Sequence, residues 1–369
     1  MAENDNDLIY RIGVTLIPGI GNMTAKKLIA WCGDPEAIFR ESRADLLKIP
    51  GMAKILHAGI NLKELLKRAE QEMTFIRNGD IKPLYYYDDE YPERLKQCAD
   101  SPLMLYYKGM EGIFEKRMLA VVGTRMATSY GKRVCQEIIE GFENDDVVIV
   151  SGMAYGIDSC AHRRALSCGL ETIGVMGHGL DRIYPNENRS MAAKMLPQGG
   201  LLTEFLSGSK PDRENFPKRN RIIAGLSDAV LVVESATKGG AIITAEIANS
   251  YNRDVFAVPG RLQDPFSDGC HLLIRRNIAA LARTADDIRY SMGWKNRSEK
   301  RKNNQDLLNQ YEQEERAILK IILEKDRAHI DEIVLMAGLG ASKTASTLLK
   351  LEFEGVIQGL PGKLYEIRR

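Results

Sequence analysis

Residues 118–125 read Met-Leu-Ala-Val-Val-Gly-Thr-Arg, an apolar run that stops at a glycine and is followed by a cation. Such a run is typical of a buried strand that ends in a loop. The same texture returns downstream, with predicted strands at 146–150, 171–176, 201–205, 229–234 and 254–258. Helical patterns lie between the strands, at 130–142, 159–167, 220–226 and 241–251. This alternation predicts an α/β fold with a doubly wound, mostly parallel sheet.

The loop after the first strand has the chemistry of an anion site. Gly123 and Thr124 precede Arg125, and Thr128 or Ser129 can cap the helix that follows. Glycine allows close backbone approach, and the arginine lies beside the positive end of the helix dipole. The loop lacks the G-x-G-x-x-G fingerprint, and the chain has no G-x-x-x-x-G-K-[ST] motif. The sequence therefore argues against a nicotinamide-dependent enzyme and against a P-loop ATPase.

A second basic stretch reads Phe-Pro-Lys-Arg-Asn-Arg-Ile-Ile at 216–223, where a loop is expected to open into a helix. Its cations can neutralise phosphates, and its aromatic ring can stack on an unpaired base. A surface loop with solvated charges is the alternative, but neighbouring strand-end loops carry the same chemistry. A later glycine pair also precedes a helix, so we expect one electropositive groove. The predicted DNA-binding residues are Gly123, Thr124, Arg125, Phe216, Lys218, Arg219, Asn220, Arg221, Gly239, Gly240 and Thr244.

The second predicted strand leads into a helix that carries Asp158 and His162 four residues apart. This spacing is compatible with an acid/base pair. Because no paired nucleophile is evident, we favour a structural role in which Asp158 braces the turn and His162 packs nearby.

Residues 1–78 are expected to form a small helical domain. Leu16-Ile17-Pro18-Gly19-Ile20-Gly21 leads into a helical stretch with Lys26, and a weaker copy follows at 49–52. The pattern resembles a helix-hairpin-helix (SAM-like) domain, whose glycine amides approach a DNA phosphate. Gly19, Gly21 and Lys26 are therefore predicted as a possible secondary DNA site. A turn kept only for packing remains the alternative.

The C-terminal part of the chain has a different organisation. A polar linker is predicted at 291–314, after a core at 79–290, and a last domain at 315–369. Helical patterns at 315–325, 330–336 and 341–353 precede a predicted hairpin of 356–358 against 364–366. Three helices and a two-stranded wing predict a winged helix. Its recognition helix carries Lys343 and Lys350 but also Glu352 and Glu354, and this near-neutral face favours a protein-interaction or packing role.

The composition restricts the kind of nucleic-acid site. A formal net charge of +1 and a pI near 7.6 require a local patch, since the whole molecule has no attracting field. No apolar run approaches the ~20 residues of a membrane span, and the polar start predicts a cytoplasmic protein. The six cysteines show no C-x-x-C spacing, and five histidines are scattered. We expect no structural metal and no cofactor.

The ordered motifs resemble those of the DNA-processing protein A family, DprA, also called Smf. The motifs that carry the resemblance are V-G-T-R, S-G-x-A-x-G-I-D-x-x-A-H, G-x-G-x-D-x-I-Y-P-x-x-N, T-E-F, F-P-x-R-N-R-I-I-A-G-L, V-V-E and F-A-V-P-G, spread over residues 85–285. The resemblance implies an extended Rossmann-like core that binds single-stranded DNA without strong sequence preference. It also implies a homodimer that protects incoming strands and loads the RecA recombinase during natural transformation, with no established catalytic activity.

By the same resemblance, Arg125 matches the family's phosphate-binding arginine, and Arg219 and Arg221 match its invariant pair. Phe216 and Asn220 take the accompanying aromatic and amide positions. The segment 239–245 departs from the family pattern by losing two hydroxyls, although its backbone amides can still bind phosphate. His271 and Asn277-Ile278 also stand where the family usually has an Asn and a Gly-Ala pair.

Two other functions remain open from the sequence. A nucleotide-processing hydrolase of the phosphoribohydrolase type needs P-G-G-x-G-T-x-x-E, whereas this chain has Lys-Gly-Gly-Ala-Ile-Ile-Thr-Ala-Glu at 238–246, with a different glycine-to-threonine spacing. The second alternative is a protein-interaction scaffold that functions through its winged helix.

Overall fold

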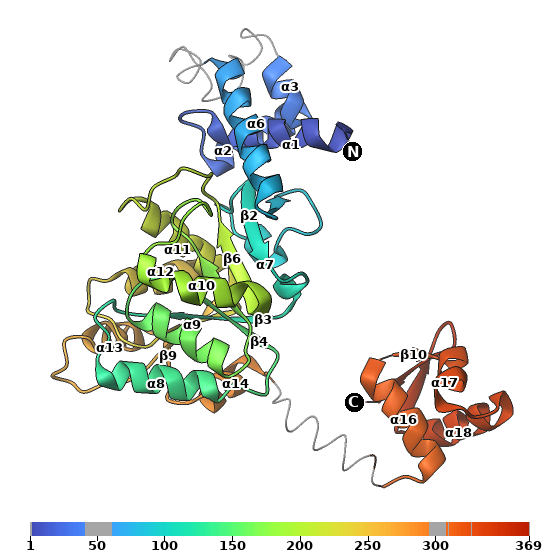
Figure 1. Cartoon of the computed structure of the whole chain (residues 1–369). Helices are drawn as coiled ribbons and strands as arrows, with labels where there is room; N and C mark the ends of the chain where they lie inside the picture. The colour runs from blue at the N-terminus through green and yellow to red at the C-terminus, as the bar shows by residue number, and fades with distance from the viewer. Residues whose placement is uncertain (1, 41–60, 295–307, 309, 326, 369) are drawn as a thin grey trace. The chain divides into compact units, whose positions relative to one another are not determined.

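The computed structural model describes residues 2–40, 61–294, 308, 310–325 and 327–368, which form two compact units that divide after Gly293 (Figure 1). The weaker hairpin copy at 49–52 and most of the predicted linker lie outside the described residues. The predicted division of the chain at residues 78, 290 and 314 stays a prediction.

A nine-stranded sheet is the centre of the first unit, with the strand order β1-β2-β6-β5-β4-β3-β7-β8-β9 in the described part of the chain. Strands β3 to β9 are parallel, whereas β2 is antiparallel to both β1 and β6. The bounds are β1 Lys82–Tyr85, β2 Met104–Gly109, β3 Arg117–Val122, β4 Val147–Ser151, β5 Thr172–Val175, β6 Gly199–Thr203, β7 Ala229–Val232, β8 Asp254–Ala257 and β9 Ala280–Leu281. The doubly wound, mostly parallel sheet predicted from the sequence is confirmed, and β1, β2 and β9 are added to the six predicted strands.

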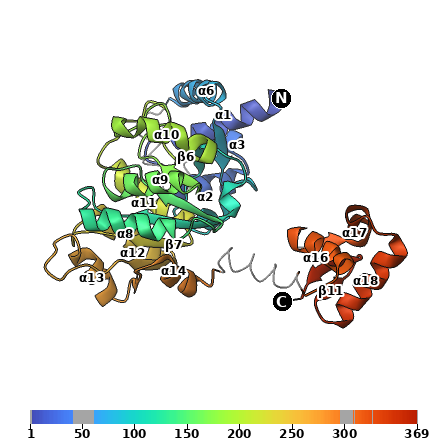
Figure 2. The ribbon, with the colours of Figure 1, turned by 60° about the horizontal axis from the view of Figure 1, so that its bottom comes forward.

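Helices cover both faces of this sheet (Figures 1 and 2). Their bounds are α7 Glu93–Lys96, α8 Ser129–Glu140, α9 Ile157–Ser167, α10 Arg189–Met195, α11 Asn215–Leu226, α12 Gly240–Ser250, α13 Asp268–Arg275 and α14 Ala285–Met292. Alternate residues of β3, such as Ala120 and Val122, share a buried cluster with Ile222 of α11 and Ala245 of α12. Because successive side chains of a strand point to opposite faces, the residues between them face the other helical layer. The sheet is therefore a buried platform.

The chain order places a switch point at the centre of the sheet. Successive strands from β3 to β6 extend the sheet one way, and β7 then pairs with the other side of β3, where Ala120 lies opposite Val230. In such sheets ligands bind beyond the carboxyl ends of the strands on either side of the reversal. The loops that follow β3 and β7 are therefore the first place to look for a site.

The N-terminal helices are α1 Ala2–Leu16, α2 Asn22–Cys32, α3 Pro35–Arg40 and α6 Leu62–Asn78. Their apolar residues form one buried cluster with the antiparallel edge of the sheet, in which Ile12 and Leu28 pack with Tyr85 and Tyr106. Arg11 adds a polar tie, since its guanidinium lies 4.2 Å from the centre of the Tyr85 ring and pairs with Asp7 and Asp88. The helical region is thus packed onto the sheet within the first unit.

The second unit is a winged helix, as the sequence predicts. It contains α16 Gln313–Lys325, β10 Ala328–His329, α17 Ile330–Ala337, α18 Ala341–Phe353, β11 Ile357–Leu360 and β12 Leu364–Ile367. Strand β12 pairs with β11 and also with the short β10, which the sequence did not predict.

Beneath the carboxyl edge of the main sheet lies His162, which is fully buried. Its Nδ1 lies 2.7 Å from the hydroxyl of Thr172, and burial together with the nearby Arg219 lowers the pKa of the imidazole to about 3. Asp158 is also buried, which raises its pKa, and its carboxylate accepts a hydrogen bond from the amide of Ala154. Asp158 therefore braces the turn after β4, and His162 packs against the start of β5, in line with the structural role favoured from the sequence.

We expect the buried neutral histidine to make the protein sensitive to acid. Between pH 6.5 and about 3, His162 is protonated in the unfolded chain but neutral in the folded protein. The free energy of unfolding should therefore fall as the pH falls, by up to about 1.4 kcal/mol per pH unit. Urea unfolding of wild type and His162→Gln at several pH values measures this. The variant should lose the extra slope, whereas His329→Gln, a change at a half-exposed histidine of the winged helix, should keep it. Equal slopes in wild type and His162→Gln would contradict the assignment.

Candidate nucleic-acid interface

The loop that carries Arg125 is held in place by Glu234, which follows β7. The buried Glu234 carboxylate accepts hydrogen bonds from the amide of Thr128 at 2.9 Å and from its hydroxyl, and the Glu234 carbonyl accepts from the amide of Thr124 at 2.7 Å. Thr128 in turn caps α8 by accepting from the amide of Gly131 at 3.1 Å. These hydrogen bonds join the loop after β3 to the loop after β7, and Arg125, on the first of these loops, remains exposed.

Two glycines let the next loop lie directly against this backbone. Gly156 has a φ of +79°, and a Cβ there would lie 2.2 Å from the carbonyl oxygen of Thr124. A Cβ on Gly123 would lie 2.5 Å from Cγ1 of Ile157. The structure therefore gives Gly123 a packing role between β3 and α9, where the sequence suggested close approach to a phosphate.

Three side chains, two from loops and one from the first turn of α11, meet at this edge. The guanidinium of Arg125 lies 5.2 Å from the centre of the Phe216 ring, and the Tyr184 ring lies 6.2 Å from the same ring at an angle of 33°. Tyr184 is 44% exposed, and Phe216 is half-buried. Gly177 makes room for Phe216, since a Cβ there would lie 3.0 Å from its ring. We call these three residues, Arg125, Tyr184 and Phe216, the aromatic–arginine cluster.

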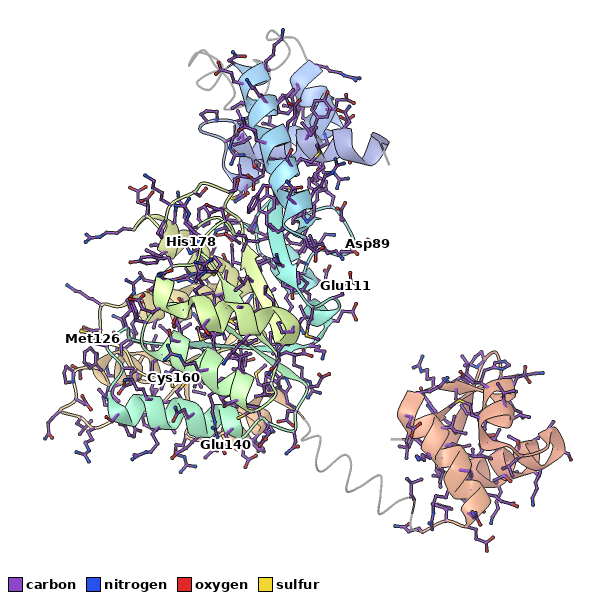
Figure 3. The ribbon with its side chains drawn as sticks, in the orientation of Figure 1. Asp89, Glu111, Met126, Glu140, Cys160 and His178 are labelled. Carbon is purple, nitrogen blue, oxygen red and sulfur yellow. The ribbon has the colours of Figure 1, made fainter. Side chains whose placement is uncertain are left out.

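The surface around the cluster is open. Met126, labelled in Figure 3, is 69% exposed beside Arg125, and Lys218, two residues after Phe216 in the chain, is also exposed. The structure corrects the expected loop here, because α11 already begins at Asn215, so Phe216, Pro217 and Lys218 lie in its first turn. Proline is tolerated there because first-turn amides have no acceptor within the helix.

Arg219 is not on the rim where the sequence placed it. It is buried, and its guanidinium donates to the carbonyl of Val175 at 2.6 Å and to that of Gly152, while its Nε donates to Asn220 at 3.1 Å. A Cβ on Gly152 would lie 2.3 Å from this guanidinium. Burial lowers the pKa of Arg219 to about 10, with Asp158 opposing the shift. The expected surface position of Arg219 is therefore wrong: the residue ties α11 to the ends of β4 and β5.

Arg221 also points away from the aromatic–arginine cluster. Residues two apart on a helix face nearly opposite directions, so Arg219 and Arg221 cannot line one groove. The Arg221 guanidinium pairs with Glu204 and donates to the carbonyl of Asp100, and its side chain is only 13% exposed. The shared rim predicted for the two arginines is corrected by this geometry.

The glycine pair lies near the start of α11. Gly239 caps α12 without a side-chain hydrogen bond, and Asn220 donates to the carbonyl of Gly240 at 3.3 Å. Thr244 is buried and donates to the same carbonyl at 3.0 Å, so its hydroxyl does not reach the surface expected for it. The start of α12 therefore offers backbone amides without hydroxyls.

The proposed secondary site has a different character in the structure. Gly19 takes a left-handed φ of +77° in the turn before α2, and Gly21 caps that helix; both are exposed. Lys26, however, lies 3.6 Å from the centre of the Tyr86 ring and donates to Ser101 at 2.6 Å. Burial lowers its pKa to about 8. This lysine packs against the sheet and is not presented to a phosphate, which corrects its predicted role.

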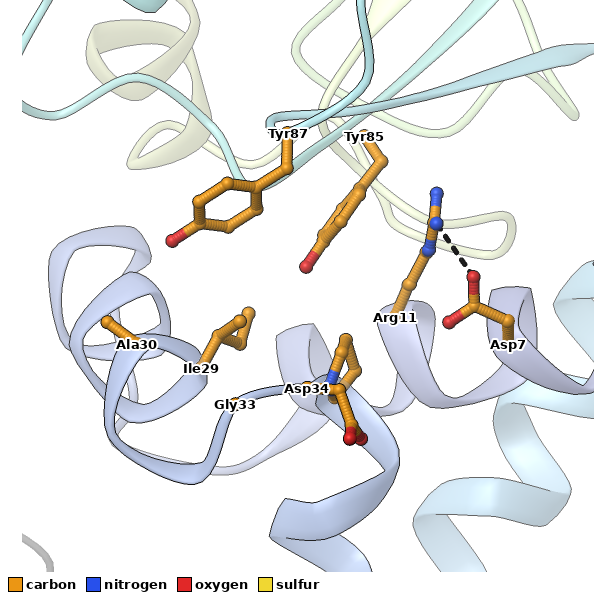
Figure 4. Close-up of a pocket in the computed structure, with 9 residues that line it drawn as sticks. Asp7, Arg11, Ile29, Ala30, Gly33, Asp34, Tyr85 and Tyr87 are labelled. Atoms are coloured by element: carbon orange, nitrogen blue, oxygen red, sulfur yellow. Dashed lines mark ion pairs between the residues drawn. The ribbon is translucent and has the colours of Figure 1, made fainter.

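A pocket of about 500 Å³ lies elsewhere, among α1, α2, the start of α3 and the end of β1 (Figure 4). Tyr85 and Tyr87 line one side, and Arg11 is paired with Asp7 at 2.7 Å. Asp34 also lines the pocket. Since carboxylates offset the arginine, the pocket does not suit a nucleotide phosphate.

Features expected of the alternatives are arranged differently. Glu246, the counterpart of a hydrolase glutamate, lies half-exposed on α12 with its carboxylate 3.7 Å from Arg276. In the winged helix, Lys343 and Lys350 pair with Glu314 and Glu315 of α16, so both lysines already have anionic partners within the unit. Among the residues that the structure describes, no group of three His, Cys, Asp or Glu side chains could hold a metal ion, and no helix is long and apolar enough to cross a membrane.

Sequence reasoning missed two residues of this interface. Tyr184 stood in a quoted motif but had no role, because a single exposed tyrosine gives no signal until the fold brings it to Phe216. Glu234 ended a predicted strand, and its link to Thr128 spans 106 residues of sequence.

Comparison with known proteins agrees with this organisation. The family described as DNA recombination-mediator protein A matches residues 82–293, and the DprA winged helix domain matches residues 303–363. The chain is 42% identical to DNA processing protein DprA of Streptococcus pneumoniae over 201 residues, 54% of this chain and 71% of that one. It is 33% identical to the putative DNA processing protein DprA of Mycobacterium tuberculosis H37Rv over 91% of this chain and 88% of that one.

Two solved structures have the same fold. The X-ray structure of the Streptococcus pneumoniae protein covers 76% of this chain and 96% of its own, with a TM-score of 0.63 and 35% identity. DNA processing protein A of Helicobacter pylori, whose structure was solved to describe its single-stranded DNA binding mode, covers 57% of this chain and 95% of its own, with a TM-score of 0.52 and 28% identity. With matched motifs, matched core and matched winged helix, this chain belongs to the DNA-processing protein A (DprA/Smf) family.

Proposed function

We propose that this protein binds single-stranded DNA along the carboxyl edge of its sheet and acts as a recombination mediator. The aromatic–arginine cluster is the observation that carries the proposal. Two neighbouring rings and an exposed guanidinium at a topological switch point provide stacking surfaces for unpaired bases and a partner for phosphate. The Helicobacter pylori relative, described by its single-stranded DNA binding mode, supports the same use of the shared core.

The residues around the cluster divide into two groups in this proposal. Arg125, Phe216, Tyr184 and Lys218 contact DNA, and the amides at Gly239 and Gly240 receive a phosphate at the start of α12. Arg219, Arg221, Asn220 and Thr244 shape the site from within, because each is buried or internally hydrogen-bonded. Gly123 and Thr124 position the loop.

Family membership supports a more specific role. We propose that the protein is a cytoplasmic homodimer that protects incoming single strands and loads the RecA recombinase on them during natural transformation. The proposal assigns it no catalytic step. The buried neutral His162 and the outward-facing Glu246 support this assignment, since neither is placed to transfer a proton to a ligand at the cluster.

Arg125→Ala should weaken binding of a labelled oligo-dT and reduce its salt dependence. Losing one phosphate contact should lower the slope of log K against log salt concentration by about 0.7. Fluorescence anisotropy at several salt concentrations measures both effects. Arg164→Ala is the matched control, because Arg164 pairs with Glu140 in the last turns of α9 and α8, at the opposite edge of the sheet. An unchanged slope in Arg125→Ala would place the phosphate contacts elsewhere.

Phe216→Ala should weaken the same binding by a different mechanism. Loss of one stacked base costs about 1–3 kcal/mol, and because no charge is removed the salt slope should stay as in wild type. Phe216→Tyr, which keeps a ring, should bind nearly as well as wild type. Equal affinities of the alanine variant and wild type, with both variants folded by circular dichroism, would remove stacking at this position from the proposal.

Recombinase loading can be tested separately from DNA binding. On single strands covered with a single-strand-binding protein, we expect the wild-type chain to shorten the lag before RecA hydrolyses ATP, whereas Arg125→Ala should leave the lag longer. If wild type binds oligo-dT and the lag does not change, DNA binding stands and recombinase loading does not.

A further inference from the structure

The segment between β6 and α11, residues 204–214, leads directly to Phe216 and has no regular structure of its own. A connection of this length is free to move unless side chains hold it. In this protein the holding contacts come from the N-terminal helices. They act at two places along the segment, Ser207 and Glu204.

The first contact is made by Glu72 of α6, a carboxylate that is only 1% exposed. Its Oε1 accepts from the amide of Ser207 at 2.8 Å, and its Oε2 accepts from the Ser207 hydroxyl at 2.5 Å. Arg68, one helical turn earlier, donates to the same Oε2 of Glu72 at 2.9 Å and to the Ser207 carbonyl at 2.6 Å. The amide, carbonyl and hydroxyl of one loop residue are thus all bound by α6.

The second contact lies at the start of the segment. Glu204 accepts a hydrogen bond from Asn22 of α2 at 3.4 Å while it pairs with Arg221 of α11. Next to Ser207, the amide of Gly208 donates to Asp181 at 3.0 Å, on the loop that also carries Tyr184. Holding Ser207 therefore restrains the approach to both rings of the aromatic–arginine cluster.

A buried carboxylate is stable only when its oxygens have partners, so the burial of Glu72 depends on the position of Ser207, and Ser207 is in turn held by Glu72. We propose that Glu72 is a positioning residue for single-stranded DNA binding, which fixes the β6–α11 segment through Ser207 and thereby presents Phe216 and Tyr184 to the strand. This inference rests on the proposed function. It gives the N-terminal helices a part in DNA binding without a phosphate contact of their own.

The test compares Glu72→Gln with Glu70→Gln, which removes the same charge from an exposed position on the same helix. Glu72→Gln should raise the Kd for oligo-dT about three- to tenfold, because the binding-competent position of the segment is less populated. The salt slope should stay unchanged, since no phosphate contact is lost. Amide hydrogen exchange within residues 205–214 should become faster. Glu70→Gln should resemble wild type in all three measurements.

The sign of the effect separates positioning from simple electrostatics. Removing a negative charge near bound DNA strengthens binding if charge alone matters, so a tighter Glu72→Gln complex would overturn the proposal. An unchanged Kd with faster amide exchange would also overturn the proposal, since the contact between Glu72 and Ser207 would then be irrelevant to DNA binding. Should Glu72→Gln fail to fold, Ser207→Ala removes only the hydroxyl contact and should weaken binding in the same direction. If wild type itself does not bind oligo-dT, the proposed function fails. Amide hydrogen exchange in Glu72→Gln then still shows whether Glu72 holds residues 205–214 in place.

Discussion

This site depends on the hydrogen bonds that the buried guanidinium of Arg219 donates to backbone carbonyls. A buried charge is costly unless its donors are satisfied, and here the donors reach backbone carbonyls at the ends of β4 and β5. That requirement fixes the rotation of α11 about its axis. With Arg219 pointing inward, Phe216 lies beside Arg125, and Arg221 is directed toward Glu204 on another side of the helix. Residue 152 is a glycine because a Cβ there would collide with the Arg219 guanidinium.

The protein thus combines near-zero net charge with a local cluster of aromatic and basic side chains, which we propose as its nucleic-acid site. Many of its arginines are used internally or in ion pairs, including Arg221, Arg289 and Arg94. What is left at the switch point is a small number of exposed cations beside aromatic rings. Stacking then supplies a contribution that does not depend on salt, and the cations supply one that does. A site of this kind suits unpaired bases better than a duplex, whose bases are already stacked on one another.

The N-terminal helices and the winged helix differ in how they relate to this site. The helices are packed onto the sheet through a shared apolar cluster and through Glu72 and Asn22, which grip the segment before α11. The winged helix is a separate unit whose recognition helix has its two lysines paired with α16. Its exposed apolar side chains, Leu349 and Phe353, are the features that a phosphate-binding face would not need.

Local patterns predicted β3 to β8, the winged helix and the exposed position of Arg125, because period-2 and period-3.6 patterns and glycine-terminated runs are properties of short stretches of chain. They also located Phe216 and the glycine pair, since both lie in connections that follow parallel strands, and the carboxyl ends of those strands meet at one edge of the sheet. Only the tertiary structure shows which way Arg219 and Arg221 point and that Thr244 is buried. It also shows that Lys26 packs against Tyr86 and that Tyr184 lies beside Phe216. Each of these depends on which way a helix is turned and on partners far away in the chain, as with Glu234 and Thr128, and no local pattern carries that information.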